Sequence, residues 1–248
     1  MLVSKLRKPR RREMMIQTIP MSREAEQKLT GVKVMGAVLQ LEPVPDKLRA
    51  LSFEEEWKSL HERWRGKSKG EVAEDAHIAA YRQFYRQIGF NPNQTPPSVQ
   101  NLIQRFLIKE ALTRIPTVHP IVDAVNVAAV KGRIPLGIFD AACVKGPIRL
   151  AFTSGGEPFQ PLGSGQMEAL AEGVLVLADD EKVLSQFSYR DGEAQKITGE
   201  TRHVWLLGCQ VSEVEEAAVR AALDEAIAQL RRGYEIFMEE GVGNNGAR

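Results

Sequence analysis

The chain has little cysteine and little histidine, and this narrows the chemistry that it can carry. Its 248 residues include two cysteines, Cys143 and Cys209, which are far apart and lie in apolar segments. We therefore expect two buried, reduced thiols rather than a disulfide or a metal-binding pair. The four histidines share no metal-ligand spacing with one another or with the cysteines, so we expect no metal and no other cofactor.

Long hydrophobic runs are also lacking. No segment approaches the ~18 consecutive apolar residues of a membrane-spanning helix, and the first residues lack the apolar core of a secretory signal. We therefore expect no membrane association and a cytoplasmic location. With 43% hydrophobic and 26% charged residues, the chain has the composition of a globular protein with a substantial core.

The chain carries no strong excess of either charge, because its net charge is only +1. Binding of nucleic acid would therefore require a local basic patch. Six of the eight residues from Lys5 to Arg12 are basic. They suit either an arm that neutralises phosphates or a solvated tail that precedes the true start of the protein. We expect residues 1–14 to form a disordered basic arm and residues 241–248 a disordered tail.

The most informative stretch runs from His119 to Phe152. An apolar segment from Ile121 to Val130 is interrupted by Asp123 and Asn126, whose spacing puts both on one stripe of a helix. We expect a buried helix with a polar seam that stops at Lys131-Gly132, followed by two strands. These strands are expected at Leu136 to Phe139 and around Ile148, Leu150 and Phe152.

Hydrophobic periodicity outlines the rest of the chain. Helices are expected over Ser52 to Trp64, Glu71 to Ile88, Ser98 to Leu107 and Ser212 to Phe237, with capping boxes at Ser52/Glu55 and Ser212/Glu215 and with Ser98 as a cap. Further strands are expected over Ile16 to Pro20, Val32 to Leu41, Val174 to Ala178, Val183 to Tyr189 and Val204 to Val211, with a turn at Asp191-Gly192. No linker divides the chain, so we predict one α+β domain over residues 15–240, with a helical lead-in at about 52–114 and a core at about 117–211.

Several of these segments resemble a known family. His-Pro-Ile-Val-Asp-Ala-Val-Asn from His119, then Pro-Leu-Gly-Ile-Phe-Asp from Pro135, then Ile148 and Leu150, is similar to the B3/B4 domain, the tRNA-binding editing module of the phenylalanyl-tRNA synthetase beta subunit. The segment from Tyr85 to Gly89, with Ile115-Pro116, resembles the helical lead-in of free-standing B3/B4 proteins. The resemblance implies a β-sandwich-like core of mixed strands, extended by helices at its N-terminal side and by one C-terminal helix.

Two polar groups of residues are candidates for a binding site. Asp123 and Asn126 either brace neighbouring loops or, as the resemblance implies, line the pocket that holds the aminoacyl end of tRNA. The second group is a solvated hairpin or a site in which Arg190 and Lys196 hold phosphate or carboxylate and Tyr189 stacks on a base. The predicted substrate- or RNA-binding residues are Asp123, Asn126, Tyr189, Arg190, Asp191, Lys196 and Thr198.

The chain departs from the editing family at positions that matter for chemistry. The resemblance places a histidine where this chain has Gly137, a glutamate where it has Leu207, and a threonine where it has Val125. In the family these groups recognise the phenolic hydroxyl of a tyrosyl ester and help to set up its hydrolysis, so that activity is not expected here. No Ser-His-Asp or Cys-His arrangement replaces them, and the catalytic residues stay unassigned.

Three functions remain open from the sequence. The least specific is a purely structural or partner-binding protein, in which Asp123 and Arg190 would be exposed or braced with no pocket between them. Another is a tRNA-associated protein that binds an aminoacylated or modified RNA end, with trans-editing as a further step. If it is an enzyme, it is an aminoacyl-tRNA deacylase and not a complete tRNA ligase. The third is a module that binds a small amino-acid-like metabolite without RNA. None of these functions calls for DNA as a partner, and salt dependence separates the last two, because RNA binding weakens steeply as salt rises.

Overall fold

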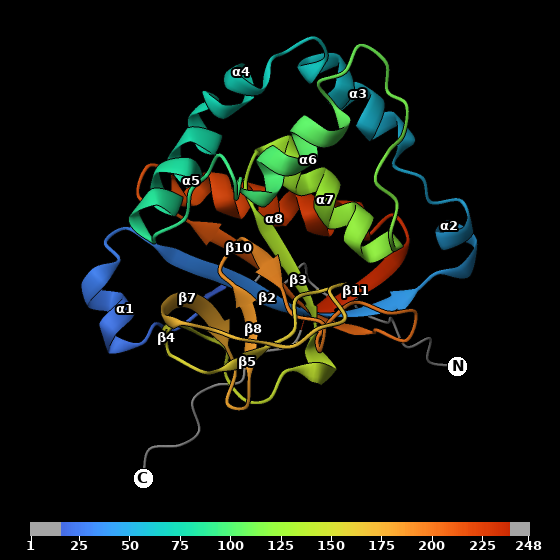
Figure 1. Cartoon of the computed structure of the whole chain (residues 1–248). Helices are drawn as coiled ribbons and strands as arrows, with labels where there is room; N and C mark the ends of the chain where they lie inside the picture. The colour runs from blue at the N-terminus through green and yellow to red at the C-terminus, as the bar shows by residue number, and fades with distance from the viewer. Residues whose placement is uncertain (1–15, 239–248) are drawn as a thin grey trace, which may run out of the picture.

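The computed structural model describes residues 16–238 and builds them around an antiparallel sheet of five strands, sheet A (Figure 1). Its longest strand is β2 (Lys33–Pro43), and β10 (His203–Gln210) pairs with it along its whole length, from His203↔Gln40 to Gln210↔Lys33. Strand β3 (Leu136–Asp140) follows on the far side of β10. On the other side of β2 lie β1 (Gln17–Thr18) and β11 (Tyr234–Met238).

A second antiparallel sheet, sheet B, is built from a more local part of the chain. Its strands are β4 (Arg149–Ser154), β7 (Glu172–Ala178), β8 (Val183–Gln186) and β9 (Arg190–Asp191), in that order. A small hairpin of β5 (Pro158–Phe159) and β6 (Glu168–Ala169) has a separate core with sheet B, formed by Phe159, Leu170, Val176 and Val183. The main core is continuous and includes buried residues from both sheets and from the helices. The fold is therefore α+β, as the sequence predicts.

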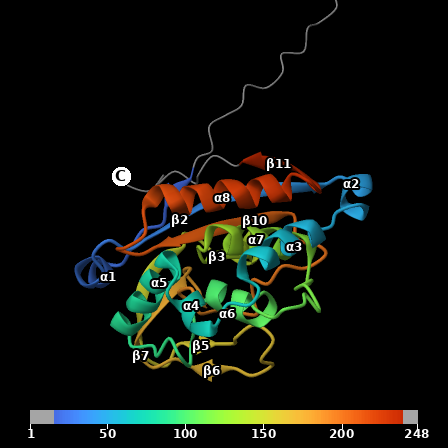
Figure 2. The ribbon, with the colours of Figure 1, turned by 90° about the horizontal axis from the view of Figure 1, so that it is seen from above.

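Helices α7 (Pro120–Gly132) and α8 (Glu216–Leu230) pack side by side on one face of sheet A (Figures 1 and 2). The contact is close, since a Cβ atom added to Gly208 of β10 would lie 2.8 Å from Val219 Cγ1 of α8. The remaining helices are α1 (Arg23–Lys28), α2 (Pro45–Arg49), α3 (Glu54–Trp64), α4 (Lys69–Ala73), α5 (Ala76–Gln87), α6 (Ser98–Phe106) and the 3-10 helix η1 (Ala141–Cys143). Helices α3 to α6 form the helical lead-in.

Helix ends differ from the predictions. The predicted capping boxes at Ser52 and Ser212 are wrong: α3 begins after Phe53 and α8 after Glu215, and neither cap makes a side-chain hydrogen bond. Ser212 Oγ instead donates to the carbonyl oxygen of Thr30 at 2.7 Å. The capping box present is Ser68 with Glu71, at the start of α4. Capping motifs are short and recur by chance, so tertiary contacts decide which of them cap a helix.

Several element boundaries are also corrected. The helix predicted over Glu71 to Ile88 is two helices, because Glu74 ends α4 and Asp75 caps α5. Ser98 lies inside α6, whose cap is Pro97. Helix α7 includes Gly132, and Arg133 ends it with a left-handed backbone (φ 58°).

Two further segments differ from the predicted elements. No helix is predicted after Ser22, yet this segment is helical, because the Ser22 side chain accepts a hydrogen bond from Ala25 N and caps α1. Tyr234 and Phe237 lie in strand β11 and not in the last helix, because β2 offers them a free edge. Side-chain periodicity alone could not reveal that edge.

Two further observations limit the kinds of site available. No helix in residues 16–238 is long and apolar enough to cross a membrane. In the same residues, no three of the His, Cys, Asp and Glu side chains are grouped so that they could hold a metal ion. The predicted basic arm at residues 1–14 and the predicted tail at residues 241–248 lie outside the described residues.

Candidate functional site

A small pocket of about 70 Å³ lies where sheet A meets the turn between β8 and β9. It brings together the start of β3, the end of β10, the first residue of α6 and the β8–β9 turn. Its lining residues are Ser98, Pro135, Leu136, Gly137, Ser188, Tyr189, Arg190, Asp191 and Cys209. Three predicted site residues, Tyr189, Arg190 and Asp191, are therefore placed next to Gly137, the position at which the chain departs from the editing family.

The β8–β9 turn owes its shape to Phe187, which has a left-handed backbone (φ 42°). This conformation is unusual for a bulky residue, and the buried ring of Phe187 packs on Phe84 of α5, with 5.1 Å between the ring centroids. The strand predicted to run to Tyr189 therefore ends at Gln186. The turn predicted at Asp191-Gly192 is wrong, because Asp191 pairs with Ser185 in sheet B and the chain reverses earlier.

Tyr189 lies on an aromatic row beside the pocket. Its ring is 5.3 Å from that of Phe90, which is 5.5 Å from that of Tyr85. Tyr189 is 37% exposed, while Tyr85 is buried and its hydroxyl is 3.0 Å from Ser188 Oγ. Packing against Phe90 holds the Tyr189 ring in place, and the rest of the ring remains exposed to solvent. This arrangement suits stacking on a flat ligand group.

Asp191 is the unpaired charged group of the pocket. No donor in the described part of the chain bonds its carboxylate, and burial without compensation raises its pKa to about 7. Burial, with the nearby Asp191 charge, raises the pKa of the Cys209 thiol to about 12. The thiol is therefore not a nucleophile at neutral pH. At neutral pH the pocket therefore contains the Asp191 carboxylate, a hydrogen-bond acceptor that is close to its pKa, next to the unreactive Cys209 thiol.

Arg190 is held by residues of the protein itself. Its Nε donates to Gln186 Oε1 at 2.6 Å, and its guanidinium forms an ion pair with Glu168 of the β5–β6 hairpin. The guanidinium carbon also lies 5.7 Å from the centroid of the Phe159 ring. Arg190 therefore fastens the hairpin to the pocket, and its charge is already paired before any ligand arrives.

The structure separates Lys196 and Thr198 from this pocket. The Lys196 ammonium forms an ion pair with Glu193, three residues away. Thr198 N donates to Thr201 Oγ1 at 2.9 Å, and that hydroxyl donates to the buried Asp140 carboxylate at 2.6 Å. Neither Lys196 nor Thr198 lines the pocket, and the Thr198 segment braces the turn after β3.

Asp123 lies at the N-terminal end of α7, in a different cavity of about 200 Å³ that Phe53, Trp57 and His119 also line. Its side chain is 6% exposed, and its Oδ1 accepts a hydrogen bond from Val118 N at 2.9 Å. Burial raises the pKa of Asp123, although bonds from backbone N–H groups oppose the shift. This geometry agrees with the interpretation of Asp123 as a loop brace. Asn126 is half-buried on α7 and is not among the residues that line the pocket with Asp191.

The two departures from the editing family meet in sheet A. Gly137 and Leu207 are cross-strand partners, and a Cβ atom on Gly137 would lie 4.0 Å from Leu207 Cβ. Leu207 is 1% exposed, and its Cδ2 would lie 2.5 Å from a Cβ atom on Gly36 of β2. An apolar side chain packed over a glycine thus occupies the place where the resemblance puts a glutamate. The polar pair that would read a phenol is replaced by Gly137 and Leu207.

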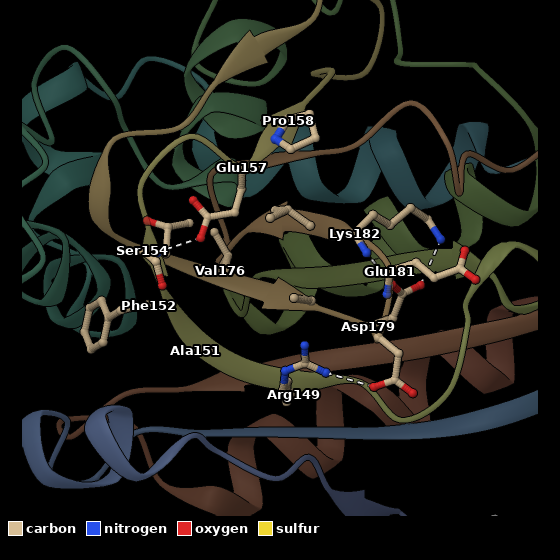
Figure 3. A pocket seen from close by; sticks show the side chains of 14 residues that line it. Arg149, Ala151, Phe152, Ser154, Glu157, Pro158, Val176, Asp179, Glu181 and Lys182 are labelled. Atoms are coloured by element: carbon tan, nitrogen blue, oxygen red, sulfur yellow. Dashed lines mark hydrogen bonds and ion pairs between the residues drawn. The ribbon is translucent and has the colours of Figure 1, made fainter.

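A larger cavity of about 300 Å³ lies on sheet B near the β5–β6 hairpin (Figure 3). Four of its charged groups form two ion pairs. Arg149 Nη1 lies 3.1 Å from Asp180 Oδ1, and Lys182 Nζ lies 2.8 Å from Asp179 Oδ2. Burial alone would raise the pKa of Asp179, but the Lys182 ammonium and three backbone N–H groups hold it below its usual value. This cavity therefore offers less unsatisfied polar chemistry than the small pocket.

Comparisons with known proteins identify the family of the chain. The family model described as "B3/4 domain" matches residues 80–233, which is more than half of the chain. The chain belongs to the B3/4 domain family. The phenylalanine–tRNA ligase beta subunit of Legionella pneumophila (strain Lens) is 31% identical to this B3/4 protein over 105 residues. That of Haemophilus ducreyi is 34% identical over 108 residues.

These relatives are much longer than the B3/4 protein. Their alignments cover 42–43% of this chain and only 13–14% of theirs. An N-terminal fragment of the phenylalanyl-tRNA synthetase beta subunit from Pyrococcus horikoshii, a crystal structure, has 20% identity and a TM-score of 0.41, and the match covers 49% of this chain and 43% of that one. The family match begins within α5, so the central strand β2 comes from outside the matched residues.

Sequence reasoning missed part of the pocket of this B3/4 protein. Ser98 was expected only as a helix cap, and Ser188 and Cys209 only as parts of strands, yet all three line the pocket. Ser98 and Cys209 lie about 110 residues apart in the chain, and no local pattern links them. The sequence signal that could have located this part of the pocket is the Pro135-Leu136-Gly137 motif, because all three of its residues line the pocket.

Proposed function

We propose that this B3/4 protein binds the aminoacylated or modified end of a tRNA in the pocket between Gly137 and the β8–β9 turn. The observation that carries the proposal is the unpaired Asp191 carboxylate, which lines the same pocket as the Pro135-Leu136-Gly137 motif. Support also comes from the relatives, whose names describe them as beta subunits of phenylalanine–tRNA ligase.

The roles follow from the chemistry of the lining. The Asp191 carboxylate accepts hydrogen bonds from the α-ammonium group of an aminoacyl ester, a charged donor that would satisfy it. Tyr189 stacks on the terminal base. At about 70 Å³ the pocket has room for roughly five water-sized spheres. It therefore takes an ammonium group with its α-carbon and a small substituent, and it excludes an aromatic side chain.

Hydrolysis would be substrate-assisted in this proposal. The described pocket provides no activated nucleophile, because burial keeps the Cys209 thiol protonated at neutral pH. The protein would orient a water molecule and the ribose hydroxyl against the ester carbonyl, a contribution of positioning alone. The replaced pair, Gly137 and Leu207, removes the recognition of a tyrosyl phenol.

The test is deacylation and binding with a panel of correctly charged and mischarged tRNAs. We expect wild-type protein to bind charged tRNA more tightly than uncharged tRNA. We expect it not to hydrolyse the phenylalanine-specific tRNA that has been mischarged with tyrosine. Asp191→Asn should reduce the preference for the charged form, and Tyr189→Ala should weaken binding of both forms. Gln27→Ala, an exposed change on α1, is the matched control.

Two outcomes would contradict the proposal. Equal affinity of wild type for charged and uncharged tRNA would remove Asp191 from aminoacyl recognition. Binding of free amino-acid esters with no dependence on salt and no binding of tRNA would favour the metabolite-binding alternative, since only RNA binding depends steeply on salt. Rapid hydrolysis of the tyrosyl ester would show that another group replaces those missing at positions 137 and 207.

A further inference from the structure

The helical lead-in carries a concentrated positive charge, which we call the basic surface. It consists of the exposed side chains of Arg63, Arg65, Lys67, Lys69, Arg105, Lys109 and Arg114. The two segments that supply it, residues 62–71 and 104–114, contain these seven cations and three glutamates, a net charge of +4 against +1 for the whole chain. The rest of the chain is therefore net negative, even though it includes the basic residues from Lys5 to Arg12.

Backbone and side-chain contacts hold the two segments together. Gly66 N donates to the Ile108 carbonyl oxygen at 3.0 Å, and Gln104 Nε2 donates to the Lys69 carbonyl oxygen at 3.1 Å. The buried His61 ring adds a contact, with Nε2 2.8 Å from the Lys109 carbonyl oxygen. The loop after α3 and the segment after α6 thus form one continuous surface. It joins positions about 40 residues apart in the chain.

These charges are left without carboxylate partners. Within the described residues, Arg65 pairs with Glu62 at 3.4 Å, and the other six cations form no ion pair. Arg105 and Arg114 both lie 5.3 Å from the centroid of the Phe106 ring, which leaves their charge unneutralised. Cations elsewhere are paired more often, for example Lys28 with Glu24 and Lys58 with Glu54. Clustered like charges repel, so a site of this kind suits an anionic partner.

Helix α6 links the basic surface to the pocket. Ser98, its first residue, lines the pocket, and Arg105 near its end belongs to the basic surface. Seven residues of α-helix span about 10 Å. An RNA whose end enters the pocket would therefore have its next phosphates within reach of Arg105, and those further along within reach of the loop after α3.

We propose that the basic surface binds the phosphate backbone of the RNA whose end enters the pocket. This inference rests on the proposed function and adds a second contact area, on the helical lead-in. Four of its seven cations, Arg63, Arg65, Lys67 and Lys69, precede the residues matched by the B3/4 family model. The contact is to phosphates, which carry the negative charge of RNA, and phosphate contacts carry no sequence information directly. It supplies affinity, while the pocket supplies recognition of the end.

The test compares the salt dependence of tRNA binding between matched charge variants of the full chain. The test variant is Lys67→Gln/Lys69→Gln/Lys109→Gln. The control removes three exposed cations elsewhere that form no ion pair in the described chain, Arg23→Gln/Lys47→Gln/Arg231→Gln, so that the net charge is equal. We expect the test variant to bind bulk tRNA roughly ten- to a hundredfold more weakly at 0.1 M salt, with a log–log salt slope shallower by about two to three.

Further measurements separate the possible failures. The same three lysines changed to arginine should keep wild-type affinity, because the charge is retained, and all variants should keep the wild-type melting temperature. If the test and control variants bind tRNA alike, the basic surface is not the contact, although the pocket proposal stands. If wild-type protein does not bind tRNA, the proposed function fails. If polyglutamate displaces tRNA at equal charge concentration, an acidic protein is the partner and the RNA assignment is overturned.

Discussion

The Asp191 carboxylate lies near Cys209 and Tyr85, and no hydrogen-bond donor among the described residues bonds it. This lack of a donor should make the stability of the protein depend on pH. The pKa of Asp191 is raised from an ordinary 3.8 to about 7 by burial. Between about pH 4 and pH 7 the folded protein therefore binds more protons than the unfolded chain, and the free energy of unfolding falls as pH rises through this window. The stability that protonated Asp191 contributes is fully present below the pKa of Asp191 in the unfolded chain. It is lost as pH rises above the pKa of Asp191 in the folded protein.

Replacement of Asp191 by asparagine should remove this pH dependence. We expect Asp191→Asn to match wild type below about pH 4 and to be more stable at pH 8 by up to about 4 kcal/mol, at about 1.4 kcal/mol for each pKa unit. Chemical denaturation at a series of pH values measures this. If the free energies of unfolding of the two proteins change in the same way from pH 4 to pH 8, the Asp191 carboxylate already has a hydrogen-bond donor.

Asp123 has the opposite role at the residue scale, because its carboxylate holds the loop before α7. We expect Asp123→Ala to lower the free energy of unfolding by roughly 1 to 3 kcal/mol, since the N–H of Val118 would lose its acceptor. Asp123→Asn keeps a carbonyl oxygen for that bond and serves as the matched control. An unchanged melting temperature for Asp123→Ala would instead favour a ligand-facing role.

Sequence reasoning at this scale identified residue types better than their partners. The Tyr189 to Asp191 cluster was predicted as a site, and the structure does place it on a pocket. The partners of Arg190 and Thr201, however, are Glu168 and Asp140, which are 22 and 61 residues away along the chain. Such pairings depend on how the sheets pack, so the sequence could not show that Arg190 is neutralised or that Thr198 belongs to a different turn.

Among the elements, α8 and sheet A are in close contact at Gly208. A Cβ atom on Gly208 would lie 2.8 Å from Val219 Cγ1 and 3.3 Å from Leu136 Cδ2. We expect Gly208→Ala to destabilise the protein by roughly 1 to 3 kcal/mol, because α8 must move off the sheet. Gly199→Ala is the control, since no atom lies within 4 Å of its added Cβ. Equal melting temperatures for the two variants would contradict this account.

Elements with one buried face were the predictable ones. The aromatic stripe of Phe53, Trp57 and Trp64 is buried as the helical spacing of α3 predicts. Strands β2 and β10 also follow their apolar runs closely. Failures came where a distant element decides the outcome, as at Tyr234, where the edge of β2 converts the expected helix into a strand. Local periodicity cannot report on an edge that lies about 190 residues away in the chain.

At the scale of the whole molecule, the sequence predicts a helical lead-in followed by a β-rich core, but it does not predict which strands form sheet A. The longest strand of sheet A, β2, precedes the helical lead-in, whereas its partner β10 and the next strand of the sheet, β3, follow it. The B3/4 match at residues 80–233 leaves β2 out. Alternation of apolar residues marked each strand, but pairing order depends on packing between distant segments.

This topology has a consequence for synthesis on the ribosome. Strand β2 is completed about 160 residues before its partner β10 begins. At about 5–20 residues per second, the apolar run of β2 waits roughly 8 to 32 s for its neighbour. Sheet B lies within residues 149–191, so it can form while that wait continues. While residues 44–202 are made, β2 can pair only with β1, at Met35 and Gly36. Most of its length is therefore unpaired and aggregation-prone during this time, and chaperones that shield such segments would act on β2 first.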